Sequence, residues 1–457
     1  MALAKKRVAV TGGSGLLGSH VLRRLCADRS IGEVICLDLR PPTVVSTKLT
    51  FVIADVREPD FQRHLAGCDT VVHLAFLVTQ LKPRAEMQAI NVEGSKNVFR
   101  AAVAAGCQQL VYTSSIAAFG VMPGHPVPIV EDTPRRHQPA FAYSACKFEV
   151  EQFLDEFERQ HAGLVVTRLR PAVVIGAYMD HALGDALRRR VIPDNGGLPM
   201  PLVWDEDVAD AVVLAVVQRA GGAFNLQAED SVSAAQLARA GKLRLVKIPR
   251  RLAAGIARLS PMLERLHVTR AIDPAWLEHS EVTMIMSSKK AREQLGWKPK
   301  CPTAVDVIKK YVDTVPARLD RRIDVFLRLV QLAGRHAEVP EEASRMSMRV
   351  HLQLTGATGG DIALYFDRGK LTVAREVPRP PTAVVTMRAV TFLDLLTGRL
   401  DFSTAGFTGR VRVEGEGLAF LMFQGIVSMF RTQTEAAGAA GFATRQLKRW
   451  FEKGAAA

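Results

Sequence analysis

A tyrosine and a lysine four residues apart could carry proton-transfer chemistry in this chain. Tyr143 and Lys147 form the pattern Y-x-x-x-K in YSACK, and Ser115 precedes Tyr143 by 28 residues. On a helix, residues i and i+4 share a face, so the ammonium of Lys147 would stabilise a phenolate and lower the pKa of Tyr143. We expect Tyr143 to be a general acid/base, Lys147 to modulate its pKa, and Ser115 to donate to a substrate carbonyl or alkoxide.

A glycine-rich segment could bind an anion. The sequence TGGSGLLG (11–18) follows the apolar run RVAV (7–10) and opens a helix-period segment. Glycines permit a tight turn, a close approach of the backbone to a pyrophosphate, and close helix–strand packing, while the helix N-terminus attracts the anion. We therefore predict a dinucleotide site, in which Lys147 would also hold the nicotinamide ribose. The contacts predicted in this segment are Gly12, Gly15, Leu16, Leu17 and Gly18.

Two charged residues bear on the choice of dinucleotide. Asp38 ends the second apolar run, 20 residues after Gly18. A carboxylate at this point accepts hydrogen bonds from the ribose hydroxyls and repels a 2′-phosphate, which favours NAD. Arg40 leaves NADP open, because a guanidinium two residues further on could bind that phosphate.

These residues need a frame of strands and helices to position them. Short apolar runs alternate with helix-period segments, such as 18–28 and 92–105, through the first 175 residues. Runs that are apolar on both sides are typical of strands buried on both faces of a parallel sheet. We therefore predict an α/β fold with a Rossmann-type doubly wound sheet at about 1–175 and a smaller substrate lobe at about 176–315. The predicted strands are 7–10, 33–39, 49–55, 70–75, 109–115 and 164–171.

Several motifs occur in the order found in one enzyme family. TGGSGLLG, Asp38, YTSSIAAFG (112–120), YSACK and LRPAVVIG (169–176) resemble the extended short-chain dehydrogenase/reductases, also called NAD-dependent epimerase/dehydratases, over about residues 7–312. The resemblance implies an NAD(P)-dependent oxidoreductase and a homodimer formed through a helical bundle that includes the YSACK helix. It also implies cofactor contacts at Asp55, Val56, Leu74, Ala75, Asn91 and Pro171.

The substrate class depends on the motif LRPAVVIG. Sugar-nucleotide epimerases of this family usually carry an asparagine here, whereas Pro171 resembles the hydroxysteroid-dehydrogenase and dihydroflavonol-reductase branch. The favoured reaction interconverts a secondary alcohol and a ketone on a hydrophobic, sterol-like or lipid substrate, as in 3β-hydroxysteroid dehydrogenases. The alternative is a sugar-nucleotide or lipid-linked-sugar epimerase/dehydratase with tightly bound NAD. Arg188, Arg189 and Arg190 could bind its phosphate, although such a charge run is usually a solvated helix face.

A second domain follows a charged linker at 316–345. Within 346–432, apolar and polar residues alternate in MRVHLQL, DIALYFDRGKLTVAR, TAVVTM and GRVRVEG, and 391–401 is helical in pattern, which predicts a small α+β domain. This stretch resembles sterol-carrier proteins, with Gly415-Glu416 where that family has GD. The resemblance implies a five-stranded sheet packed against helices and a lipid ligand. A plain oligomerisation module is the other interpretation, and 433–457 is an Ala/Gly-rich tail ending in a short basic helix.

The bulk composition limits location and partners. No apolar run in the 457 residues approaches the ~18–20 residues needed to span a bilayer, and the opening MALAKKRVAVTGG lacks the apolar region of a secretory signal. Six scattered cysteines without a C-x-x-C pair predict a cytoplasmic protein with reduced thiols, in which Cys146 packs in the core.

The net charge of +14 raises the question of acidic partners. No zinc-ligand spacing or ribonucleoprotein motif accompanies the basic stretch 241–300, so we predict no nucleic-acid partner and no metal. The basic amphipathic segments 321–335 and 442–454 would suit peripheral membrane contact. Ordinary surface helices have the same pattern, so both interpretations stay open.

Overall fold

The computed structural model divides the chain into two units, Met1–Asp313 and Thr314–Ala457. It describes residues 5–78, 83–177, 179, 182–188, 190–194, 196–247, 282–315, 323, 347–355, 360–367, 370–374, 381–415, 417, 421, 424 and 425. Apart from residue 323, the predicted linker and both predicted basic amphipathic segments lie outside these residues, as does Arg189.

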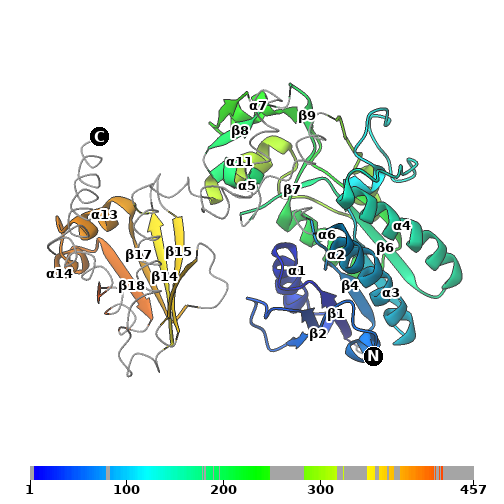
Figure 1. The fold of residues 1–457 in the computed structure, drawn as a ribbon, viewed down its shortest axis with the longest axis horizontal. Helices are drawn as coiled ribbons and strands as arrows, with labels where there is room; N and C mark the ends of the chain where they lie inside the picture. The colour runs from blue at the N-terminus through cyan, green and yellow to red at the C-terminus, as the bar shows by residue number, and fades with distance from the viewer. Residues whose placement is uncertain are drawn as a thin grey trace. The chain divides into compact units, whose positions relative to one another are not determined.

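A seven-stranded parallel sheet forms the centre of the first unit, which confirms the predicted doubly wound α/β fold (Figure 1). Its order is β11-β6-β5-β4-β1-β2-β3. The six strands predicted from apolar runs all form, within a few residues of the expected bounds. The seventh, β11, comes from beyond residue 175 and pairs with β6 at the edge. The strands are β1 (Lys6–Thr11), β2 (Ile31–Asp38), β3 (Leu49–Ile53), β4 (Thr70–His73), β5 (Gln109–Thr113), β6 (Val165–Pro171) and β11 (Gly222–Leu226).

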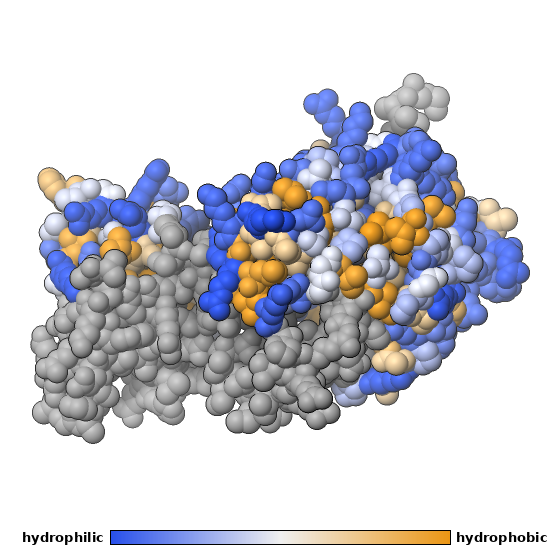
Figure 2. Space-filling model, turned by 90° about the horizontal axis from the view of Figure 1, so that it is seen from above, coloured by the Kyte–Doolittle hydropathy of each residue, from blue (hydrophilic) through white to orange (hydrophobic). Residues whose placement is uncertain are grey.

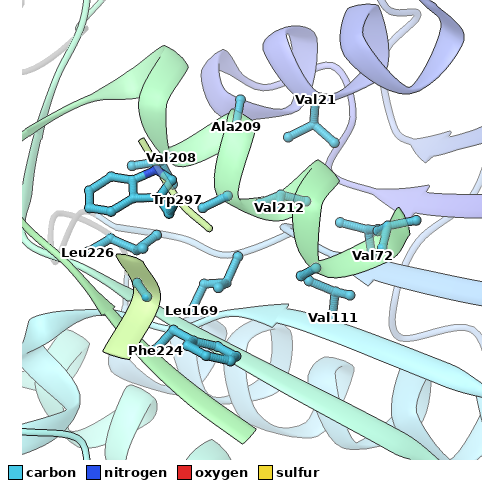
Figure 3. Packing of buried hydrophobic residues seen from close by; sticks show 14 of the residues in the cluster. Val21, Val72, Val111, Leu169, Val208, Ala209, Val212, Phe224, Leu226 and Trp297 are labelled. Carbon is cyan, nitrogen blue, oxygen red and sulfur yellow. The ribbon is translucent and has the colours of Figure 1, made fainter. Parts of the chain in front are cut away.

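Helices cover both faces of this sheet. Successive side chains along each strand point to opposite faces, so neighbouring residues on a strand belong to different cores. Val8 and Val10 of β1 join the core under α1 (Leu16–Ala27) and α6 (Asp205–Gln218). Ala9, between them, joins the opposite core under α3 (Gly94–Ala104) and α4 (Ala142–Gln160). Figure 3 shows the first core, in which Val21 of α1 and Val212 of α6 lie above the valines of the sheet. Burial on both faces therefore explains the two-sided apolar runs.

Short elements connect the strands to these helices. After β4 the chain forms α2 (Arg84–Met87) and a π-helical turn, η2 (Gln88–Glu93), before α3. Two 3₁₀ turns, η1 (Phe61–Leu65) and η3 (Ile116–Phe119), follow β3 and β5. The hydroxyl of Ser115 accepts a hydrogen bond from the backbone N–H of Ala117, so Ser115 caps η3 at the end of β5.

The lobe between residues 173 and 315 is built from small paired elements. Two distant parts of this stretch meet in space, because the indole N–H of Trp297 donates to the carbonyl of Asp207 at 2.7 Å. The carboxylate of Asp207 in turn accepts from the backbone N–H groups of Lys300 and Cys301. The paired strands are β7 (Val173–Ile175) with β10 (Leu202–Trp204), β8 (Val191–Pro193) with β13 (Arg244–Val246), and β9 (Pro199–Met200) with β12 (Val232–Ser233). The described helices are α5 (Ala182–Arg188), α7 (Ala234–Ala240), α10 (Lys289–Gln294) and α11 (Ala304–Thr314).

The second unit contains the predicted α+β domain. Its five-stranded sheet has the order β16-β15-β14-β17-β18, with β14 and β17 parallel and the other pairs antiparallel. One sheet face packs Leu352 and Val385 against Phe392 of α13, which gives this unit a core of its own. The elements are β14 (Ser347–Thr355), β15 (Gly360–Asp367), β16 (Lys370–Ala374), β17 (Ala383–Arg388), α13 (Ala389–Thr397), α14 (Phe402–Phe407) and β18 (Val411–Gly415).

On the face drawn in Figure 2, hydrophilic residues alternate with several apolar groups among the described residues. Among the described residues, no helix is both long and apolar enough to cross a membrane. All six cysteines are free thiols, and five of them, including Cys146, are buried. No group of three or more potential metal ligands occurs within the part of the chain that the structure describes.

Candidate active site

The glycine turn between β1 and α1 has the shape required for a bound pyrophosphate. Gly12 has a φ of +71°, and a Cβ there would lie 2.6 Å from the backbone nitrogen of Ala75. A Cβ on Gly18 would lie 2.7 Å from the Cα of Gly13. Gly15 caps α1 without a side chain, and no acidic residue lies in the first turn of the helix. No acidic side chain of that turn therefore competes with a bound anion for the first backbone N–H groups of α1, which include those of Leu16 and Leu17.

Asp38 lies at the end of β2, beside this turn. Its carboxylate accepts hydrogen bonds from the backbone N–H of Ser14 at 3.0 Å and from that of Arg40 at 3.2 Å. A carboxylate has about four acceptor positions, so room for ribose hydroxyls remains. The side chain of Arg40 is exposed beside it. These residues fit the adenosine half of a dinucleotide.

The remaining predicted cofactor contacts lie at the same carboxyl edge of the parallel sheet or just behind it. Leu74 and Ala75 follow β4, and Ala75 closes against Gly12. Val56 packs in the core, whereas the carboxylate of Asp55 pairs with Arg57 at 2.6 Å. The pKa of Asp55 is lowered, mainly by this hydrogen bond.

Asn91 and Pro171 have backbone roles in the structure. The side-chain amide of Asn91 accepts from the backbone N–H of Leu77 at 2.7 Å and donates to its carbonyl at 2.9 Å. Asn91 therefore holds the segment after β4 in place, and its amide keeps one N–H and one acceptor position beyond these two bonds. Pro171 is the buried last residue of β6, opposite Leu226 of β11.

The three predicted catalytic residues come together where β5 meets α4. Tyr143 and Lys147 lie one turn apart in the first half of α4, and Ser115 follows β5. The ammonium of Lys147 donates to the carbonyl of Thr113 at 2.8 Å and to the hydroxyl of Tyr112 at 3.1 Å. It also lies 3.4 Å from the centre of the Phe76 ring, a cation–π contact.

Burial controls the acidity of this pair. It raises the pKa of Tyr143 to about 12, although a hydrogen bond with Ser115 acts in the opposite direction. Burial also lowers the pKa of Lys147 well below its ordinary value, and the carboxylate of Glu151 opposes that shift. A buried phenol beside a buried ammonium is the arrangement expected for proton transfer, because each charged form stabilises the other.

The surroundings of Tyr143 are apolar. Its ring packs edge-on against Phe76, with 5.7 Å between ring centres, and lies 6.2 Å from the ring of Phe141. Met87 and Val121 complete this side of the cluster. The sequence did not mark these residues, because they come from separate loops and helices that only the fold brings together.

A second group that the sequence analysis missed lies directly behind the catalytic residues. Glu151 is fully buried and forms ion pairs with Arg170 at 2.5 Å and Arg135 at 2.6 Å. The hydroxyl of Ser114 donates to it at 2.5 Å. The available signal was the spacing, because Tyr143, Lys147 and Glu151 recur every four residues on one helix.

His73 forms another buried polar group below the glycine turn. Its Nδ1 lies 2.7 Å from the hydroxyl of Thr11, and its Nε2 lies 2.9 Å from that of Ser95. Burial lowers the pKa of His73 to about 3, so the ring is neutral at physiological pH. It therefore joins β1, β4 and α3 by neutral hydrogen bonds.

A parallel sheet with a glycine turn, an acid on the second strand and a Tyr–Lys pair defines a Rossmann-type oxidoreductase domain of dinucleotide-dependent type. Comparison with family models makes this more specific. Residues 8–226 match the NAD dependent epimerase/dehydratase family, and residues 329–428 match the SCP-2 sterol transfer family. The chain therefore carries an epimerase/dehydratase domain, for which the cofactor is NAD, followed by an SCP-2 domain.

Individual relatives of the first domain differ in their chemistry. An uncharacterised protein of Mycobacterium tuberculosis is 27% identical over 65% of this chain and 81% of its own length. A UDP-glucose 4-epimerase of Streptococcus mutans is 26% identical over 64% of this chain and 91% of its own. A 3-beta-hydroxysteroid dehydrogenase of Mycolicibacterium neoaurum is 31% identical over 37% of this chain and 48% of its own. The solved structure of a UDP-galactose 4-epimerase shares the fold, with a TM-score of 0.52 and 21% identity over 67% of this chain and 98% of that one.

Proposed function

We propose that the chain is an NAD-dependent oxidoreductase that interconverts a secondary alcohol and a ketone on a hydrophobic, sterol-like or lipid substrate. Tyr143 is the general acid/base, Lys147 lowers its pKa and holds the nicotinamide ribose, and Ser115 donates to the substrate oxygen. Bound NAD supplies the hydride acceptor or donor at its nicotinamide ring.

The observation that carries this proposal is the apolar cluster around Tyr143. Phe76 and Val121, the partly buried members of this cluster, offer no hydrogen-bonding groups for sugar hydroxyls, and Phe141 and Met87 lie fully buried in the same cluster. A sugar bound here would lose its hydrogen bonds to water without replacement, which costs about 1–3 kcal/mol for each unsatisfied group. A sterol or acyl chain has few hydrogen bonds to water to lose, and burial of its apolar surface is favourable.

The attached domain supports the same substrate class. An SCP-2 sterol transfer domain on the same chain gives a hydrophobic substrate a second binding site. The similarity to a 3-beta-hydroxysteroid dehydrogenase also favours a sterol, although it covers only 48% of that enzyme.

The roles of the residues follow from their contacts. In the direction of alcohol oxidation, Tyr143 must accept the hydroxyl proton, so its phenol must first lose its own proton. Lys147 lies on the same helix face and is held by Thr113 and Tyr112, which fixes its positive charge near the phenol. The hydrogen bond between Ser115 and Tyr143 places the serine hydroxyl beside the same oxygen.

Replacement of Tyr143 by Phe tests this proposal. With a panel of sterols, hydroxy-lipids and sugar nucleotides, the wild-type protein should change absorbance at 340 nm only with an apolar alcohol in the presence of NAD or an apolar ketone in the presence of NADH. Tyr143→Phe should reduce that turnover at least about 100-fold, because general acid–base catalysis contributes about that much or more. NADH binding, followed by fluorescence, should persist because the phenyl ring still packs against Phe76.

Tyr311→Phe is the matched control for this experiment. Tyr311 is also buried, and its hydroxyl donates to the carbonyl of Gly184 at 3.3 Å, within the lobe. Its replacement should leave turnover at the wild-type level. Equal losses in both variants would indicate general destabilisation and would count against a catalytic role for Tyr143.

A sugar-nucleotide or lipid-linked-sugar epimerase/dehydratase is the second candidate. The UDP-glucose 4-epimerase relative favours it, because the similarity covers 91% of that enzyme. Such an enzyme retains its NAD, so no absorbance change would accumulate at 340 nm. Isomerisation of a UDP-sugar on chromatography, without turnover of any apolar alcohol, would replace the first proposal with this one.

A further inference from the structure

The last residues of β5 and the two that follow it are each bonded to one face of α4. Tyr143, Lys147 and Glu151 are spaced by four residues, so their side chains stack along one side of the helix. Tyr143 bonds to Ser115, and Lys147 donates to Tyr112 and Thr113. Glu151 accepts from the hydroxyl of Ser114 at 2.5 Å. Glu151 is thus the third member of the row that contains the two candidate catalytic residues.

Glu151 also joins this row to the other elements around the site. The guanidinium of Arg170, which precedes Pro171 at the end of β6, donates to both of its carboxylate oxygens, at 2.8 and 2.5 Å. Arg170 further donates to the carbonyl of Glu131 at 2.8 Å and lies 4.8 Å from the centre of the Phe119 ring in η3. One carboxylate therefore connects α4, β5, β6 and, through Arg170, the turn that follows Ser115.

More positive than negative charges surround Glu151. Two arginines, Arg170 and Arg135, approach it from β6 and from the loop before α4, and Asp155 on the next helix turn shares Arg135 with it. Burial would disfavour Glu151 as an anion, but the arginines outweigh this and lower its pKa to about 2. Glu151 therefore carries a negative charge throughout the physiological range.

Several titratable groups face Lys147. On α4 they are Tyr143, Glu151 and the thiol of Cys146, and from the sheet they are Tyr112 and the neutral ring of His73. Phe76 and Tyr112 cover the ammonium with their rings. Among these neighbours, Glu151 is the one carboxylate.

We propose that Glu151 is a positioning residue for the catalytic pair: its buried carboxylate keeps Lys147 in the charged form and fixes α4 against the strand ends that carry Ser115 and Pro171. This inference rests on the proposed function, because it assigns Glu151 a role through Lys147. A purely structural ion pair would hold the helix in place without setting the charge of the lysine.

The test measures the protonation of Lys147 directly in the full-length protein. Lysine labelled with ¹³C at Cε reports its charge by NMR, and the resonance of Lys147 is identified by its loss in Lys147→Met. Glu151→Gln should lower the midpoint of the Lys147 titration by about one pH unit or more, because it removes a charge one helix turn away. Glu151→Asp keeps the charge and should restore most of the wild-type midpoint.

Asp155→Asn is the matched control, since Asp155 occupies the next turn of α4 and pairs with Arg135 and Arg168. It should leave the Lys147 midpoint unchanged. If Glu151→Gln does not fold, the double variant Glu151→Gln/Arg170→Gln is compared with Arg170→Gln, because both lack the same guanidinium and differ only in the carboxylate. The double variant should have the lower Lys147 midpoint of the two.

A folded Glu151→Gln with the wild-type Lys147 midpoint, or a double variant with the same midpoint as Arg170→Gln, would overturn the inference. So would a shift of equal size in Asp155→Asn. Failure of the proposed function gives a different result: no substrate in the panel would show Tyr143-dependent turnover, while Glu151→Gln would still shift the Lys147 titration. The two results are therefore separable.

Discussion

Burial determines the chemistry of individual residues in the candidate site. Tyr143, Lys147 and His73 are all shielded from water, yet the effect differs with the sign of the charged form. Burial raises the pKa of Tyr143 to about 12 and lowers that of His73 to about 3, because it disfavours the anion in one case and the cation in the other. Neutral His73 can then hold neighbouring elements together by hydrogen bonds, whereas the acid/base role proposed for Tyr143 depends on a charged Lys147.

The buried His73 should make the protein less stable in mild acid. Its folded pKa of about 3 lies below the ordinary 6.5, so its stabilising effect is complete above pH 6.5 and is lost as the pH falls toward 3. Between pH 7.5 and 5.5 this residue alone should cost about 1.4 kcal/mol of unfolding free energy. Urea unfolding at both pH values measures it, and His73→Gln should show a correspondingly smaller pH dependence. An identical pH dependence in the variant would contradict this account.

Asp38 should set the choice between the two nicotinamide cofactors. Its carboxylate lies at the end of β2, held by the N–H groups of Ser14 and Arg40. Asp38→Asn should raise the affinity for NADPH relative to NADH by about tenfold, because one like charge no longer faces the 2′-phosphate. Fluorescence titration with both reduced cofactors checks this. Adding Arg40→Ala to Asp38→Asn should lower the affinity for NADPH again, and an unchanged NADPH affinity would show that Arg40 does not bind the phosphate.

Individual elements position these residues through a few close contacts. The turn before α1 depends on Gly12, and one face of α4 carries Tyr143, Lys147 and Glu151 in successive turns. Val150 and Leu154, three and seven residues after Lys147, lie beside this row on the same side of α4 and contribute to the core beneath the sheet. The same helix is thereby fixed by apolar packing and presents its polar row to the end of β5.

Gly12→Ala should damage both the turn and cofactor binding. The new Cβ would lie 2.6 Å from the nitrogen of Ala75, and the residue would have to keep a φ of +71°. We expect a loss of more than about 1 kcal/mol in unfolding free energy and of measurable NADH binding. Gly106→Ala is one control: its φ is +78° but nothing lies near its Cβ, so it has the backbone cost without a clash. The exposed Gly163→Ala is a second control that has neither the backbone cost nor a clash. If Gly12→Ala still bound NADH, a close approach of the cofactor pyrophosphate to the backbone of this turn would be excluded.

At the scale of the whole molecule, each of the two units has its own hydrophobic core residues: the N-terminal unit has them on both faces of its sheet, and the C-terminal unit has a separate cluster. The N-terminal unit holds the candidate active site, and the C-terminal unit holds the SCP-2 domain. A lipid bound by the second domain would be presented at high local concentration to the first, since both are on one chain. The homodimer implied by the family resemblance stays a prediction, which sedimentation can test.

Separate cores predict two unfolding transitions. Leu352→Ala should lower the transition of the C-terminal unit, and Leu110→Ala that of the N-terminal unit, each by about 2–5 kcal/mol, because both leucines are fully buried. Calorimetry of the full chain, with NADH added to mark the N-terminal transition, distinguishes them. A single transition that both variants shift equally would mean that the two units unfold together.

Some features could be predicted from the sequence because they depend on local order. The six core strands are apolar on both sides, and the glycine turn, Asp38 and the Tyr–Lys pair lie at fixed distances along the chain. The seventh strand, β11, was missed because GAFNL contains a glycine and an asparagine and follows the lobe. Its place beside β6 is decided by a sheet edge that the rest of the fold creates.

The sequence by itself therefore determined the two domain types, the cofactor class and the candidate catalytic residues, since each depends on residue type and spacing along a strand or helix. Only the tertiary structure decided what surrounds those residues. Phe76 and Phe141 reach Tyr143 from different segments, and Arg135 and Arg170 meet at Glu151 from a loop and a strand. Burial and charge neighbours depend on distances through space, and a sequence gives distances only along the chain.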